Sequence, residues 1–266
     1  IAEIALRTRE PFQLVGLAGK YLGKWGKIVM VISQFLSSFG SLLAYLIGEC
    51  IALSALVGGS SFWWTFIFWI IGSTVLLWGL KIVSRLDIFI SLGTLIVIAI
   101  IALVSAPSLQ SIHLLELYPA NLFLPYGVFL FALMGASAIP QVEEIVASRQ
   151  IAFKRVLIVA GIVVACAYAL FITAVIGVTG SGTTEVATVG LGKVVGPFVL
   201  VLGNLFAIFA MAGGFLNVGI ATKRTCARDF KIPRITAWLI TACVPFILFL
   251  IGIRNFVETI GIVGAF

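Results

Sequence analysis

Long apolar stretches, separated by short polar ones, follow one another along most of the chain. They lie near 28–57, 62–80, 88–106, 122–146, 155–179, 195–222 and 235–253, and a last one, near 256–266, runs to the end. A membrane-spanning helix needs about 20 mostly apolar residues. The apolar residues form continuous runs, whereas the strands of an outer-membrane barrel alternate. The pattern therefore predicts an all-α polytopic membrane protein, with one transmembrane domain over 1–266 that opens with a cytoplasmic loop over 1–27.

The overall composition supports lipid as the solvent for these stretches. Of the 266 residues, 62% are hydrophobic and 10% are charged, against about 25% charged in an ordinary soluble domain. So few charges cannot cover the surface of a soluble fold of this length. Because the sequence opens on Ile1 inside a polar segment and closes inside an apolar one, we expect it to be the middle of a longer protein, and no signal peptide is visible.

Lysine and arginine mark one side of the predicted bundle, because cytoplasmic loops retain positive charge. Fifteen of the 17 basic residues fall in the first segment and in every second loop after it, and only Lys193 and Arg254 fall in the loops between. We expect the basic side to be cytoplasmic and the protein to be a multi-pass protein of the cell membrane. Topology then accounts for the net charge of +7, and nucleic-acid binding is not needed to explain it. The fifteen are Arg7, Arg9, Lys20, Lys24, Lys27, Lys81, Arg85, Arg149, Lys154, Arg155, Lys223, Arg224, Arg228, Lys231 and Arg234.

The residues that most often carry enzyme chemistry are scarce. His113 is the only histidine, and the four cysteines have no spacing suited to zinc or to a redox motif. We expect four free thiols, with Cys226 in a cytoplasmic loop. The sequence therefore favours neither an enzyme nor a metal or cofactor site.

A polar interruption lies near the middle of the 122–146 stretch, where Gly135-Ala-Ser-Ala is followed by Pro140. Proline removes a backbone donor and disfavours helix just before it. Pro140 also suits the first turn of a second half-helix, where Glu143 and Glu144 would favour its dipole. The pattern predicts a discontinuous helix whose freed main-chain groups bind an ion or a substrate. A proline kink packed against neighbouring helices is the alternative.

A second set of polar residues lies in the first complete stretch. Ser41, Tyr45 and Glu49 are four residues apart and so share a helix face. An ionisable group at the depth of Glu49 costs about 3 kcal/mol to bury, which makes it a candidate functional acid. The alternatives are a structural acid bonded to a neighbouring helix and one hydrated from outside. For Asn204 and Asn217, in the 195–222 stretch, hydrogen bonds between helices are the favoured explanation.

Several segments together resemble the amino acid/auxin permease family of the amino acid-polyamine-organocation superfamily. The resemblance runs over nearly the whole chain, and it is the order of the segments that carries it. They are 3–8 (EIALRT), 20–26 (KYLGKWG), 131–140 (FALMGASAIP), 214–219 (GFLNVG) and 261–266 (GIVGAF).

This resemblance implies a LeuT-like fold of two inverted five-helix repeats, in which the chain would begin just after the second helix and stop within the tenth. It implies that an amino acid binds at the broken sixth helix, over Met134, Gly135, Ala136 and Ser137, with Tyr45 bordering the pocket and Phe131 as a gate.

Sodium-coupled relatives place hydroxyl groups where this sequence has Ala212-Gly213-Gly214. The resemblance therefore favours proton coupling, or an uncoupled exchanger, over sodium coupling, and for proton coupling the acid would be Glu49 or Glu143. The resulting hypothesis is secondary active transport of an amino acid by alternating access. The competing class is a channel or a non-transporting membrane subunit, although these stretches hold few acids that could line a pore.

Overall fold

The structure is a computed structural model, and it describes residues 12–114, 126–132, 135, 138–139, 142, 150–184 and 187–265. The described residues form helices joined by short connections and contain no strand, which confirms the predicted all-α polytopic class. By length and composition, α2, α3, α4, α7, α9 and α10 are long and apolar enough to cross a membrane. The helices are α2 (Leu14–Val57), α3 (Ser61–Trp78), α4 (Leu80–Ser105), α5 (Tyr126–Ala132), α7 (Gln150–Thr179), α8 (Ala187–Val195), α9 (Pro197–Arg224), α10 (Arg234–Ile251) and α11 (Phe256–Ala265).

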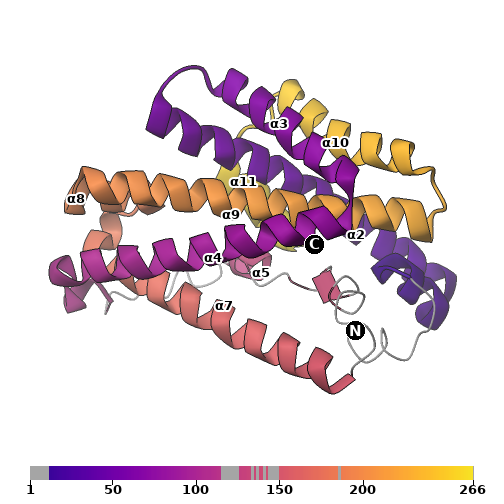
Figure 1. The fold of residues 1–266 in the computed structure, drawn as a ribbon, viewed down its shortest axis with the longest axis horizontal. Helices are drawn as coiled ribbons and strands as arrows, with labels where there is room; N and C mark the ends of the chain where they lie inside the picture. Colours follow the sequence, from indigo (N-terminus) through magenta and orange to yellow (C-terminus); the bar gives the residue numbers. More distant parts are fainter. Residues whose placement is uncertain are drawn as a thin grey trace.

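Helix α9 runs through the middle of the bundle and packs mainly against α2 and α4 (Figure 1). Helices α3 and α10 lie beside α2 on one side of it, and α4 and α7 lie on the other. The main apolar core forms where α2, α3 and α9 meet, around Leu42, Leu46, Phe68 and Phe215. Because α9 contacts helices on both sides, its small residues determine how closely those helices approach.

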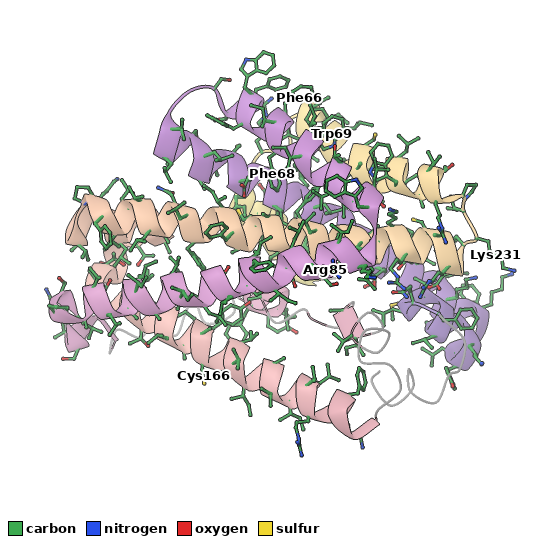
Figure 2. All side chains as sticks on the ribbon, viewed as in Figure 1. Phe66, Phe68, Trp69, Arg85, Cys166 and Lys231 are labelled. Carbon is green, nitrogen blue, oxygen red and sulfur yellow. The ribbon has the colours of Figure 1, made fainter. Side chains whose placement is uncertain are left out.

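The contact between α3 and α10 combines ring stacking with hydrogen bonds. The Trp69 indole N–H on α3 donates to the carbonyl of Ala242 at 2.8 Å, and Trp238 on α10 donates back to Ser73 at 2.7 Å. The Trp69 ring also stacks on Phe246, with 4.4 Å between centroids. Figure 2 shows Trp69 with Phe66 and Phe68 along α3. Both indole donors are thereby satisfied within the bundle, as buried tryptophans require.

Residues 14–27, predicted to lie in a cytoplasmic loop, belong to a helix in the structure. Helix α2 begins at Leu14, and it is interrupted at Gly23, whose φ of 71° lies in the left-handed region that glycine adopts at little cost. The segment 14–22 presents a buried apolar face at helical spacing. The exposed Lys20 and the basic residues that follow it interrupt the apolar pattern, so the sequence alone does not indicate this face. The buried residues are Leu14, Val15, Leu17 and Ala18.

The first turn of this short segment is held by an acidic residue far along the chain. Asp229 accepts hydrogen bonds from two backbone N–H groups, that of Gln13 at 2.9 Å and that of Gly16 at 2.7 Å. Asp229 ends the π-helical turn Thr225–Asp229 that follows α9. The carboxylate thus satisfies two of the amide donors that every helix start leaves unpaired.

The helices run back and forth so that the basic segments meet at one end of the bundle, called here the basic end. Helices α2, α4, α7 and α10 begin there, and α3 and α9 end there. Figure 2 shows Lys231 in the turn between α9 and α10 at this end. Lys193 follows the far end of α7 and Arg254 follows the far end of α10. The placement agrees with the alternation of charge along the sequence.

Candidate functional site

Two of the predicted site residues, Tyr45 and Phe131, lie against each other. Their rings, on α2 and α5, have centroids 6.1 Å apart and an interplanar angle of 49°. The Tyr45 ring also packs onto α9 at Gly214, where a Cβ atom would lie 2.5 Å from Tyr45 Cζ. Only a residue without a side chain accommodates the ring at this distance. Gly214 therefore lets α2, α5 and α9 converge at Tyr45.

The chain leaves helical conformation soon after Phe131. Helix α5 ends at Ala132, and Gly135 is not helical, although its carbonyl accepts a hydrogen bond from the N–H of Ala138 at 3.1 Å. The hydroxyl of Tyr168 on α7 donates to the carbonyl of Ala132 at 2.7 Å, so a side chain satisfies the end of α5. The remaining predicted residues of this segment lie outside the described residues: Met134, Ala136, Ser137 and Glu143.

A cavity of about 510 Å³ opens between α4, α7 and α9, within the usual 300–1,000 Å³ of small-molecule sites. Its lining changes character along its length. Polar side chains from the half of α4 nearer the basic end and from α9 line one part, and rings from α7 and α9 line another. The polar residues are Asp87, Ser91, Thr94 and Asn217, and the aromatic ones are Tyr168, Phe171, Phe206 and Phe209.

Asp87 and Asn217 join α4 to α9 inside this cavity. The amide Nδ2 of Asn217 donates to Asp87 Oδ1 at 2.8 Å. The bond between helices expected for Asn217 is therefore present. Asp87 was not among the predicted site residues, because the span predicted from the sequence begins at residue 88. The signal was available, since Asp87, Ser91 and Thr94 recur at i, i+4 and i+7 and so share one helix face.

Glu49 lies one helical turn beyond Tyr45 and is only 2% exposed. Its Oε2 atom is buried and has no hydrogen-bond partner among the described residues. A buried carboxylate oxygen without a partner is costly and marks a candidate functional group. Asn204 is similarly buried, and neither polar atom of its side chain has a described partner. The hydrogen bond between helices that was expected for Asn204 is therefore not found among the described residues.

The cysteines and the acids form neither a disulfide nor a metal-binding cluster in the part of the chain that the structure describes. All four cysteines are free, and no group of three or more His, Cys, Asp and Glu residues lies close enough to hold a metal. The expectation that Cys226 lies in a loop is wrong. It is buried in the π-helical turn after α9, because its side chain faces into the bundle at the basic end.

A comparison with protein families finds one match over the whole chain. The model described as "Tryptophan/tyrosine permease family" matches residues 1–266. The description is that of amino-acid permeases, as the sequence predicts, but it does not name the amino acid/auxin permeases that the motifs resemble. No curated protein matches the chain.

Proposed function

The chain belongs to the tryptophan/tyrosine permease family, and on that premise we propose that it carries an aromatic amino acid across the membrane by secondary active transport. Amino-acid transport and a multi-pass membrane location follow from the family and from the apolar helices. The aromatic substrate, the coupling and the alternating-access mechanism are the proposal. The narrower resemblance to the amino acid/auxin permeases extends it to a fold of two inverted five-helix repeats.

The graded lining of the cavity between α4, α7 and α9 is the observation that carries the proposal. The carboxylate of Asp87 offers a negative charge for the ammonium group of an amino acid. The rings of Phe171 and Phe206, 4.9 Å apart between centroids, and that of Phe209 offer an apolar wall for an aromatic side chain. An amphipathic ligand with a cationic head and a ring suits this gradient better than an aliphatic or a doubly charged one.

Two contacts support joining the predicted site around Gly135 to this cavity. Gly214 lines the cavity and also contacts Tyr45, and Tyr168 lines it while bonding the end of α5 at Ala132. We assign the substrate carboxylate to the main-chain groups around Gly135. The proposed substrate-binding residues remain Tyr45, Phe131, Met134, Gly135, Ala136 and Ser137.

We assign coupling to a proton, with Glu49 as its acceptor and Glu143 as the second candidate. The burial of Glu49 and its unpartnered oxygen support this choice. The glycine pair Gly213–Gly214 supplies no side-chain oxygen for sodium, which prefers a full shell of oxygen ligands. A channel with a charge-lined pore would use a ring of acidic side chains, and the cavity between α4, α7 and α9 contributes only Asp87 to such a ring.

Uptake by the full-length protein in liposomes tests the proposal. Labelled tryptophan, tyrosine, phenylalanine and leucine are offered under an imposed proton or sodium gradient. The proposal expects the three aromatic amino acids to accumulate when a proton gradient is present, with leucine excluded. Equal uptake of leucine would contradict the aromatic site. Flux that only follows the substrate gradient, without accumulation, would favour a channel.

A matched pair of glycine variants tests the segment around Gly135. A Cβ atom added at Gly135, or at the exposed Gly161 on α7, would have no neighbouring atom of the described residues within 4 Å. Gly135→Leu and Gly161→Leu should therefore both insert and fold, since leucine suits a membrane helix. Only Gly135→Leu should abolish substrate binding, because its side chain fills the proposed site. A monodisperse Gly135→Leu protein that transports normally would remove this segment from the site.

A further inference from the structure

A second cavity, of about 520 Å³, opens at the basic end and is called here the basic cavity. It lies where the junction between α3 and α4 meets the end of α9 and the start of α10. Its lining includes four cations, Lys223, Arg224, Arg228 and Arg234, and none of the described residues that line it is acidic. Four converging positive charges attract a ligand with concentrated negative charge.

The wall of the basic cavity is built by hydrogen bonds that fix Lys223. Its Nζ atom donates to the carbonyl of Leu76 at 2.5 Å and to that of Leu77 at 3.4 Å, at the end of α3. An ammonium group has three donors, so one remains for a ligand. Arg224, one residue further, also lines the cavity and is 8% exposed. The two hydrogen bonds thus position the charge of Lys223 before any ligand arrives.

Two helix starts open onto the same space. Gly79 and Leu80, at the start of α4, line the basic cavity, and so do Pro233 and Arg234, at the start of α10. Neither helix has a side chain that caps its first amide groups. Uncapped amides at a helix start and the positive end of the helix dipole favour a phosphate or another anion. Helix starts and side chains therefore favour the same ligand charge.

Exposed apolar side chains lie at or next to the basic cavity, which indicates a ligand with an acidic head and an apolar tail. Trp78 is 60% exposed and Leu77 is also exposed beside the cavity, and Ile235 is exposed on the next residue of α10. Tryptophan is enriched at the membrane–water interface. A free anion would use the cations and would gain nothing from these apolar side chains.

We propose that the basic cavity binds the phosphate group of an anionic membrane phospholipid, with the acyl chains lying over Leu77, Trp78 and Ile235. Basic pockets between membrane helices on the cytoplasmic side suit such headgroups. The lipid would bridge the α3–α4 junction and the α9–α10 junction. It would thereby stabilise the bundle at its basic end.

The test uses the full-length protein, delipidated in detergent, with three probes at equal concentration. These are phosphatidylglycerol, phosphatidylcholine with the same acyl chains, and inorganic phosphate. Native mass spectrometry counts bound lipid, and thermal unfolding reports stabilisation. The proposal expects retention and stabilisation with phosphatidylglycerol only. Equal effects of phosphatidylcholine would overturn the charge-based site, and equal stabilisation by phosphate would make it a free-anion site.

Charge variants locate the binding. Arg228→Gln with Arg234→Gln removes two cations from the cavity, and Arg85→Gln with Lys231→Gln removes two exposed cations outside it at the same end. A hydrogen bond to a charged group contributes about 1.5–3 kcal/mol, so the cavity pair should bind phosphatidylglycerol at least about tenfold more weakly. The control pair should bind normally. Equal weakening in both pairs would mean general surface attraction. If the double variant in the cavity is not monodisperse, Arg234→Gln alone replaces it, because this side chain is exposed. Its binding of phosphatidylglycerol is then compared with that of the control pair.

Discussion

The contact between Gly214 and Tyr45 predicts how Gly214→Ala changes the stability of the protein. Whether that change is destabilising depends on the presence of the Tyr45 ring. A Cβ atom at Gly214 would lie 2.5, 2.8 and 2.9 Å from three atoms of the Tyr45 ring, where ordinary contact is 3.4–4 Å. The Tyr45 ring would have to move away from Gly214 by roughly 1 Å to restore ordinary contact. Forcing one extra methyl group into a packed interface costs about 1–3 kcal/mol.

The higher helix propensity of alanine partly offsets this cost. Replacing glycine by alanine inside a helix stabilises it by about 0.5–1 kcal/mol. Gly214→Ala should therefore destabilise the wild-type protein by the difference. In a Tyr45→Ala background the obstructing ring is gone, so the same change should become neutral or stabilising. The interaction energy between the two positions should be about 1–3 kcal/mol.

The assay is a double-mutant cycle of wild type, Gly214→Ala, Tyr45→Ala and the double variant, each unfolded with a denaturing detergent. Gly93→Ala on α4 is the matched control, because the nearest side-chain atom to its Cβ, in Phe209, lies 3.8 Å away. That variant should be neutral or stabilising in every background. A Gly214→Ala cost that is identical with and without the Tyr45 ring would refute the steric reasoning.

Three further outcomes follow from the site and the topology. Asp87→Asn keeps the bond to Asn217 but removes the charge, and it should weaken substrate binding at least about tenfold without loss of folding; unchanged affinity in a binding assay would exclude Asp87 as the ammonium partner. Glu49→Gln should make uptake less dependent on a pH gradient, whereas a mutant with the wild-type dependence would move the coupling acid elsewhere. In a cysteine-free background, Lys24→Cys and Lys193→Cys should react with impermeant thiol reagents from opposite sides of a sealed membrane, Lys24→Cys from the cytoplasm; labelling from the same side would reject the topology.

The sequence predicted what depends on local composition. Continuous apolar runs defined the membrane helices, and the distribution of lysine and arginine agreed with their alternation. The non-helical state of Gly135 was foreseen from the small residues and the proline that follow it. A bond between helices was foreseen for Asn217, since a buried amide needs a partner. Asp87 was not foreseen as the partner of Asn217, because the packing of α4 against α9 decides which side chain faces this amide.

What the sequence analysis missed depends on contacts between distant segments. Asp87 was left outside a span because a charged residue ends an apolar window, although α4 begins seven residues earlier. In the sequence, Gly213 and Gly214 indicated a place without sodium ligands. In the structure a Cβ at Gly214 would clash with Tyr45, and one at Gly213 would lie 3.0 Å from Ile90. Their smallness also serves helix packing, and the sequence pattern alone does not show that Tyr45 and Ile90 are the side chains they face.

The bond between Asp229 and the start of α2 also has a consequence for the order of events during synthesis. The two groups that it joins, the N–H of Gly16 and the carboxylate of Asp229, are 213 residues apart. At about 5–20 residues per second, a ribosome needs roughly 10–40 s to make that intervening chain. Throughout this interval the first turn of α2 lacks the carboxylate of Asp229 that caps it. The beginning of the chain is therefore secured only after nearly all of the helices have been made.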